Sequence, residues 1–125
     1  MEEMSTAKRL SIGQIQIYFD QQGAALFLDG QKRDRVAVET SLTESRDFID
    51  RWLEASEETR PRHITKEERE LRANLRHLAR DLSRTFPKDF VNMMVQEVAK
   101  LLGERSPNLS QARLAGSVED VIFTL

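Results

Sequence analysis

Five arginines recur at helical spacing in the second half of the chain. They follow one another at steps of three, four, four and four residues: Arg69, Arg72, Arg76, Arg80 and Arg84. At about 100° per residue, these positions share a sector of roughly 80° on an α-helix. Guanidinium groups stay charged and form paired hydrogen bonds with carboxylates and phosphates. These five residues, which we call the arginine stripe, therefore predict a surface for an anionic partner.

Two chemical classes can supply that anion. The segment before the stripe carries acidic residues at steps of three, three, four and four: Glu44, Asp47, Asp50, Glu54 and Glu58. If the two helices pack through their apolar faces, their charged stripes turn outward, and contact between two molecules becomes easier than contact within one. We therefore expect a protein partner, with a homo-oligomer as one form of it. Nucleic-acid phosphates are the alternative, and a solvated charged face without a partner is the third interpretation.

The sequence offers few residues that are suited to catalysis. The chain has no cysteine and only two histidines, His63 and His77. His77 precedes Asp81 by one helical turn, so these side chains are expected to touch, but a metal site needs at least a third ligand. The sequence contains neither a nucleophile elbow nor a glycine-rich phosphate loop. We therefore expect no catalytic residues, no metal and no cofactor.

The composition favours one soluble domain over residues 1–125. Of its 125 residues, 39% are hydrophobic and 32% are charged, and the formal net charge is −2. A chain of this length can bury a core, and its slight negative charge gives no general affinity for nucleic acid. Aromatic residues make up 6%, which argues against a stacking surface for single strands. No apolar run is long enough to cross a membrane, and the N-terminus has no apolar signal segment, so we expect a cytoplasmic protein.

Two capping boxes predict the helices that position the charged residues. Ser41–Glu44 begins a helix over 42–58, and Thr65–Glu68 begins a helix over 66–85. In the second helix, an apolar face lies about 135° around from the arginine stripe. This face comprises Leu71, Leu75, Leu78, Leu82 and Phe86. The spacing therefore predicts that the leucines turn inward and the arginines outward.

A third helix is the most apolar segment of the chain. It is predicted over 87–102, with Pro87 in its first turn and Gly103 at its end. Its apolar residues cover more than half of the circumference: Phe90, Val91, Met93, Met94, Val95, Val98, Leu101 and Leu102. Helices of this kind are usually buried on several sides. We expect it to be the central helix, and the alternative is that a partner subunit covers half of it.

The first part of the chain predicts a three-stranded antiparallel meander over 12–40. Apolar residues alternate with polar ones in its first strand: Ile15, Ile17 and Phe19. Turns at Asp20–Gly23 and Asp29–Gly30 separate the strands, and glycine is expected to supply the positive φ that closes each hairpin. A helix over 12–28 is the alternative, because short apolar runs fit both structures. Residues 1–10 are expected to fray.

The C-terminal end favours a further strand. Residues 104–117 mix Pro, Gly, Ser and Asn, so we expect a loop there, and a helical turn within it is the alternative. Residues 118–124 are β-branched and aromatic, and we predict a strand that returns to the N-terminal sheet. Ser117 followed by Asp120 also permits a short helix. With strands first and helices after them, the expected fold is α+β, a small antiparallel meander packed against three helices.

These patterns predict a non-enzymatic interaction module, such as an adaptor, a regulator or an assembly factor. It is expected to bind a protein partner through the arginine stripe or the broad apolar helix. In that mechanism, apolar contact supplies affinity, and charge complementarity sets orientation and association rate. The alternative function is a nucleic-acid-binding regulator that holds phosphates with the arginine stripe.

Overall fold

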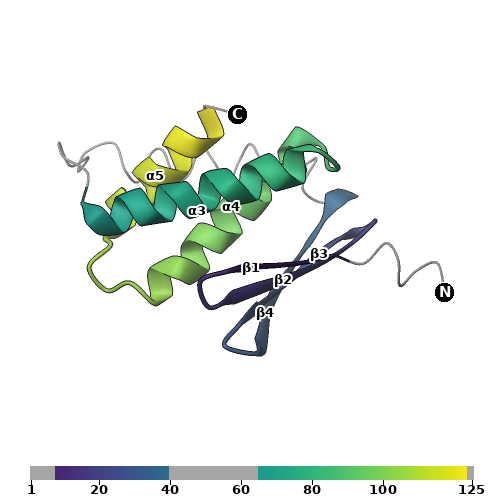
Figure 1. Cartoon of the computed structure of the whole chain (residues 1–125), viewed down its shortest axis with the longest axis horizontal. Helices are drawn as coiled ribbons and strands as arrows, with labels where there is room; N and C mark the ends of the chain where they lie inside the picture. The colour runs from purple at the N-terminus through teal and green to yellow at the C-terminus, as the bar shows by residue number, and fades with distance from the viewer. Residues whose placement is uncertain (1–7, 40–64, 124–125) are drawn as a thin grey trace.

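The computed structural model describes residues 8–39 and 65–123 of the chain (Figure 1). These residues form β1 (Lys8–Ile12), β2 (Ile15–Asp20), β3 (Gly23–Leu28), β4 (Gln31–Ala37), α3 (Lys66–Ser83), α4 (Lys88–Glu104) and α5 (Gln111–Phe123). The strands make one antiparallel sheet, and the small α+β fold predicted from the sequence is confirmed. The predicted helix over 42–58, with its acidic residues, and His63 lie outside the described residues.

The sheet is a meander in which each strand pairs with its neighbour in the order β1-β2-β3-β4. Two-residue turns join β1 to β2 and β3 to β4. Gly13 has a φ of 58° in the first turn, and Asp29 and Gly30 have φ values of 53° and 82° in the last one. Positive φ at these positions gives hairpin turns a twist that matches the strands. The strand interpretation of residues 12–28 is therefore confirmed, and the helical alternative is wrong.

Gly23 has a different role from the one predicted. Its φ is not positive; instead, a Cβ atom built on Gly23 would lie only 2.2 Å from the backbone oxygen of Val36 on β4. The turn before it is held by Asp20, whose Oδ1 accepts hydrogen bonds from the backbone N–H groups of Gln22 and Gly23, at 2.8 and 2.9 Å. Glycine is thus required here by the close approach of the neighbouring strand.

β1 adds a strand that the sequence pattern did not predict. Residues 8–10 are paired rather than frayed, because Lys8 lies opposite Phe19 and Leu10 opposite Ile17. Leu10 and Ile12 share the core side of the sheet. Two apolar positions are too few for a periodic signal, so the sequence alone does not predict β1, which is stabilised as a strand by pairing with β2.

The three helices of the described residues lie on one face of the sheet (Figure 1). α4 is the central helix, as predicted, because it contacts α3, α5, β2 and β4. Side chains from the sheet, α3 and α4 meet in one core, whose fully buried members include Ile15, Ile17, Leu26, Leu75, Leu78, Phe90, Met94 and Val98. The leucine face of the predicted 66–85 helix is therefore inward, and the fold itself buries most of the broad apolar helix.

The prediction of a strand over 118–124 is wrong, because residues 118–123 belong to α5. Its helix starts within the predicted loop, where Arg113 donates its backbone N–H to Ser110 Oγ at 3.3 Å. Four buried side chains recur at helical spacing along α5: Leu114, Val118, Val121 and Ile122. Gly103 of α4 allows the close packing, since a Cβ atom there would lie 2.5 Å from Leu114 Cδ1. Burial on α3 and α4 thus overrides the β-propensity of valine and isoleucine.

Candidate functional site

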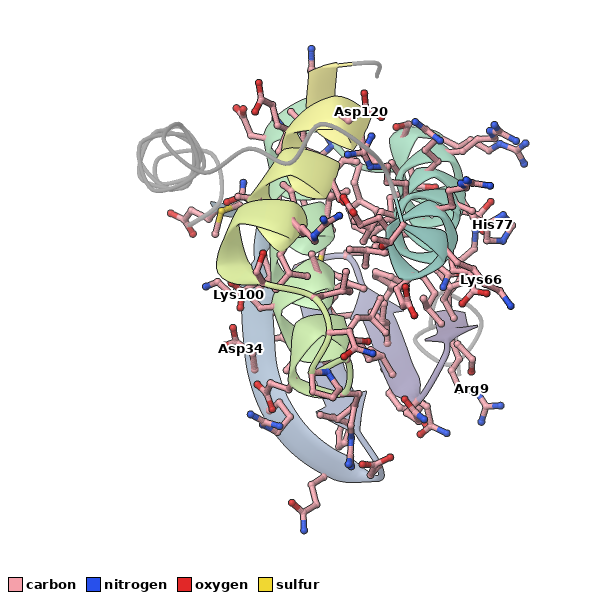
Figure 2. All side chains as sticks on the ribbon, turned by 90° about the vertical axis from the view of Figure 1, so that its left-hand side faces the viewer. Arg9, Asp34, Lys66, His77, Lys100 and Asp120 are labelled. Carbon is pink, nitrogen blue, oxygen red and sulfur yellow. The ribbon has the colours of Figure 1, made fainter. Side chains whose placement is uncertain are left out.

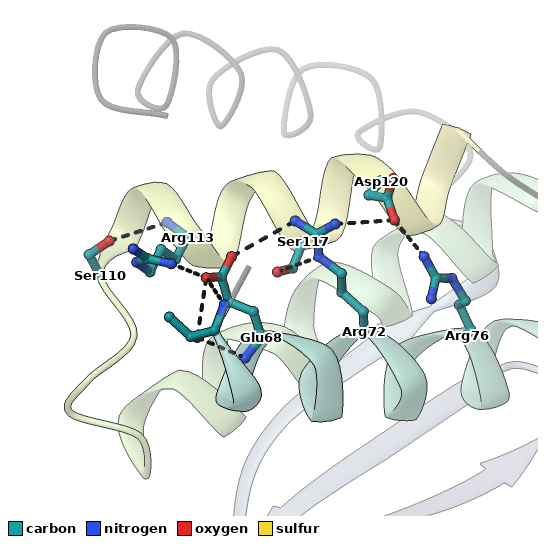
Figure 3. Close-up of polar contacts among 8 residues, drawn as sticks. Glu68, Arg72, Arg76, Ser110, Arg113, Ser117 and Asp120 are labelled. Carbon is teal, nitrogen blue, oxygen red and sulfur yellow. Dashed lines mark hydrogen bonds and ion pairs between the residues drawn. The ribbon is translucent and has the colours of Figure 1, made fainter. Parts of the chain in front are cut away.

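The arginine stripe runs along α3 and ends at its C-terminal cap, Arg84. Arg69, Arg80 and Arg84 are exposed, and none of residues 8–39 and 65–123 forms an ion pair with them. The two remaining arginines turn to α5 (Figure 3). Arg76 Nη2 lies 2.6 Å from Asp120 Oδ2, and Arg72 Nη1 lies 3.4 Å from the same oxygen. The structure therefore divides the stripe into a part bound by its own chain and a part open to solvent.

A buried carboxylate lies at the start of the same helix. Glu68 is 2% exposed and completes the predicted capping box, in which it accepts the backbone N–H of Thr65 at 3.1 Å. Arg113 of α5 pairs with Glu68 Oε1, and Arg72 lies 3.8 Å from Oε2. Burial alone raises the pKa of Glu68, but the Thr65 N–H and the Arg113 guanidinium outweigh burial and lower the pKa below 4.5. Glu68 is thus an ion held by two guanidinium groups.

These contacts join α3 to α5 as one polar network (Figure 3). Besides its ion pairs, Arg72 donates its Nε–H to Ser117 Oγ at 3.2 Å. Glu68 and Arg72 lie one turn apart on α3. The α5 partners Arg113, Ser117 and Asp120 were not predicted from the sequence. The sequence could have indicated these partners through their spacing, because steps of four and three place the guanidinium, hydroxyl and carboxylate groups on one face of a helix.

The open end of the stripe borders a hollow of about 390 Å³ between the end of α3 and β1. Its apolar lining is Leu10, Phe19, Leu82 and Phe86, and its charged lining is Lys8, Arg9, Asp81 and Arg84, with Thr85 between them. We call this the basic hollow. The three cations are exposed, and Figure 2 shows Arg9 on the same side of the molecule as His77 of α3. The single carboxylate of the lining, Asp81, is engaged by His77 at 3.5 Å, as predicted.

β1 is the outermost strand on this side of the sheet. It pairs with β2 on its inner edge, and no other strand in the described part of the chain pairs with its outer edge. Antiparallel pairing directs the backbone groups of alternate residues to each edge of a strand. The outer edge of β1 therefore presents backbone donors and acceptors directly beside the basic hollow.

A second group of titratable side chains lies on the opposite side, where Asp34 of β4 meets Glu97 and Lys100 of α4 (Figure 2). Burial, and then the hydrogen bond to Asp34, raise the pKa of Glu97 to about 7, although Lys100 Nζ lies 3.1 Å from its Oε2. The Glu97 hydrogen bond lowers the pKa of Asp34. Below about pH 7 the proton of the pair therefore resides on Glu97, whose O–H donates to the Asp34 carboxylate.

This pair predicts a loss of stability with rising pH. Because the pKa of Glu97 is higher in the folded state than its ordinary 4.5, its contribution is complete below pH 4.5 and is lost as pH rises through about 7. The shift sets an upper limit of about 3 kcal/mol on this loss of unfolding free energy, because solvent screens the pair. Urea unfolding of wild type between pH 5 and pH 8 is expected to show this loss. In Glu97→Gln, whose amide keeps the donor, the loss should vanish; an equal slope in both proteins would contradict the assignment.

Within the described residues, no three His, Asp or Glu side chains gather in a way that could hold a metal ion. None of the described helices combines the length and apolarity that a membrane span needs. No protein-family model matches the chain, and comparisons with curated proteins and with solved structures found no match either.

Proposed function

We propose that this chain is a non-enzymatic interaction module that binds an extended, acidic segment of a partner protein along β1. The observation that supports this proposal is the position of the basic hollow beside the outer edge of β1, with which no described strand pairs. An extended peptide can add to such an edge through main-chain hydrogen bonds, and pockets for alternate side chains then supply specificity. A cytoplasmic location belongs to the same proposal, since a chain without cysteine suits a reducing compartment.

Charge sets the chemistry of the expected partner. Lys8, Arg9 and Arg84 surround the hollow, and the carboxylate of Asp81 already contacts His77. Arg80 lies on the same helix one turn before Arg84 and extends the positive surface. Aspartates or glutamates of a partner would relieve the repulsion among these cations and orient its approach.

The apolar lining sets the second requirement. Phe19 and Phe86 pack with their ring centroids 5.8 Å apart, and Phe86 packs on Phe90 at 4.6 Å. The lining is therefore anchored in the core and presents a preformed surface. A strand alternating acidic and apolar residues would direct its apolar side chains into the hollow. Partner binding of this kind is what an adaptor, a regulator or an assembly factor requires.

The stripe itself supports phosphate binding less strongly than its sequence pattern suggests. Asp120 pairs with Arg72 and Arg76, so the stripe arginines that no described residue pairs with, Arg69, Arg80 and Arg84, do not form a continuous row. Arg69 is separated from Arg80 by three helical turns, about 16 Å along the axis. The function favoured by this geometry is therefore protein binding at the Arg84 end of the helix.

Selection from a random peptide library on the immobilised full chain tests this proposal. We expect the enriched peptides to alternate acidic and apolar residues and to perturb the amide NMR signals of β1 and of residues 84–86. Arg84→Glu should weaken their binding about tenfold, because it places a negative charge against acidic side chains.

Arg69→Glu is the matched control, since it reverses an exposed charge on the same helix away from the hollow. It should leave peptide affinity unchanged. Enriched peptides without acidic residues, or equal losses in both variants, would overturn the proposal. Sedimentation of wild type tests the homo-oligomeric form, in which β1 of a second copy pairs with this edge.

A further inference from the structure

The outer face of the sheet, turned away from the three helices, carries two rows of side chains across the strands. The first row is Arg9, Tyr18, Ala25 and Arg35, and the second row is Ser11, Gln16, Phe27 and Lys32. Each row runs through paired positions, so its members point to the same side of the sheet. A register irregularity between Leu26 and Phe27 places Lys32, rather than Arg33, opposite Phe27. We call these eight residues the outer sheet face.

Two aromatic rings lie at the centre of the outer sheet face. Tyr18 is 42% exposed, and among the described residues no other large hydrophobic side chain is classed as exposed. The Phe27 ring packs edge-on against it, with 5.4 Å between the centroids. Beside the rings is a hollow of about 550 Å³ whose lining includes Gln16, Ala25 and Arg35. The small side chain of Ala25 leaves room for a flat group that stacks on Tyr18.

The charges of this face favour an anionic ligand. Arg9, Lys32 and Arg35 are exposed cations at its two edges. Asp20, the carboxylate in the lining of the hollow, lies 3.4 Å from Arg35 and offsets the charge of that one arginine. A second copy of the chain is a poor occupant, because two such faces would bring like charges together.

We propose that the outer sheet face binds single-stranded nucleic acid. Tyr18 and Phe27 would stack bases, the edge cations Arg9, Lys32 and Arg35 would contact phosphates, and the Gln16 amide can donate to and accept from base edges. Aromatic platforms flanked by cations bind single strands because every base has a π-face and every nucleotide a charge. Duplex DNA keeps its bases stacked inside and does not fit this surface. This site is separate from the basic hollow, although Arg9 reaches both.

Fluorescence anisotropy of labelled single-stranded DNA and RNA oligonucleotides of mixed sequence, titrated with the full chain, tests the proposal. Tyr18→Ala is expected to weaken binding about tenfold or more, as loss of one stacking contact does. Lys32→Ala should lower the slope of log affinity against log salt by about 0.7, the value for one phosphate contact on a single strand. Lys66→Ala, which removes an exposed cation of α3, is the control that should change neither quantity.

Three outcomes would overturn the proposal. The first is that Tyr18→Ala binds as wild type does. The second is that a duplex of the same sequence binds as tightly as the single strand. The third is that polyglutamate or a free mononucleotide displaces the oligonucleotide at equal concentration, which would assign the face to acidic protein or to small nucleotides. Arg84→Glu separates this site from the proposed function, because it should weaken peptide binding about tenfold and leave oligonucleotide affinity unchanged. Circular dichroism of Tyr18→Ala verifies that the sheet is intact.

Discussion

Replacing Glu68 with leucine is expected to lower the free energy of unfolding by about 3 kcal/mol. The substitution leaves the guanidinium groups of Arg72 and Arg113 facing each other without the buried carboxylate, and it removes the capping box of α3. Removing one partner of a buried pair typically costs about 3–5 kcal/mol, and the partial exposure of both arginines keeps the loss near the lower limit. Urea denaturation at pH 7 measures it.

Two variants and one pH series test whether the loss of stability comes from the ionised carboxylate of Glu68. Glu68→Gln keeps an acceptor for the Thr65 N–H, so it should lose less than the leucine variant. Glu67→Leu removes an exposed charge from the same helical turn and should lose less than about 1 kcal/mol. Because the folded-state pKa of Glu68 is lowered, its contribution disappears as pH falls below about 4.5, and wild type and Glu68→Leu should converge in acid. A constant difference at every pH would contradict the ionic explanation.

Gly23→Ala is expected to destabilise the fold by about 3 kcal/mol. The new Cβ atom would lie 2.2 Å from Val36 O and 2.9 Å from the Cα atom of Ala37. Both are backbone atoms that cannot rotate away, so β3 and β4 must separate next to the turn. Thermal or urea unfolding measures the loss.

Gly116→Ala is the matched substitution in the opposite direction. A Cβ atom at Gly116 meets nothing within 4 Å, and the residue lies within α5. Alanine should therefore stabilise the protein by about 0.5–1 kcal/mol through its higher helix propensity. If both alanine variants changed stability in the same direction, the close strand approach at Gly23 would not explain the first result.

Local signals in the sequence predicted the parts of the fold that depend on neighbours in the chain. The leucine spacing and the Thr65–Glu68 capping box define α3, and the bounds of α3 and α4 lie within two residues of those predicted. The last element was predicted as a strand because Val121 and Ile122 favour strands. The helical spacing of Leu114, Val118, Val121 and Ile122 was the stronger signal, since an α-helix buries all four on one side.

The candidate site depended more on contacts between distant residues. Arg76 and Asp120 are 44 residues apart, and no spacing rule connects them. The stripe was therefore predicted correctly as a helical row, yet its division between α5 and solvent required the packing of two helices. The outer sheet face shows the same limit, because the irregularity in β4 decides which of two adjacent cations accompanies Phe27. Aromatic residues make up only 6% of the chain, yet strand pairing brings two of them, Tyr18 and Phe27, together on one face of the sheet.

The two-residue turns of the meander have a consequence for the order of folding. Every strand pairs with the strand next to it in sequence, so closing the sheet requires only short loops and little chain entropy. During synthesis from the N-terminus, β1 to β4 emerge before α4, whose packing against β2 and β4 completes the core around Ile15, Ile17 and Leu26. Nascent chains paused between these elements would therefore be the species most prone to aggregate.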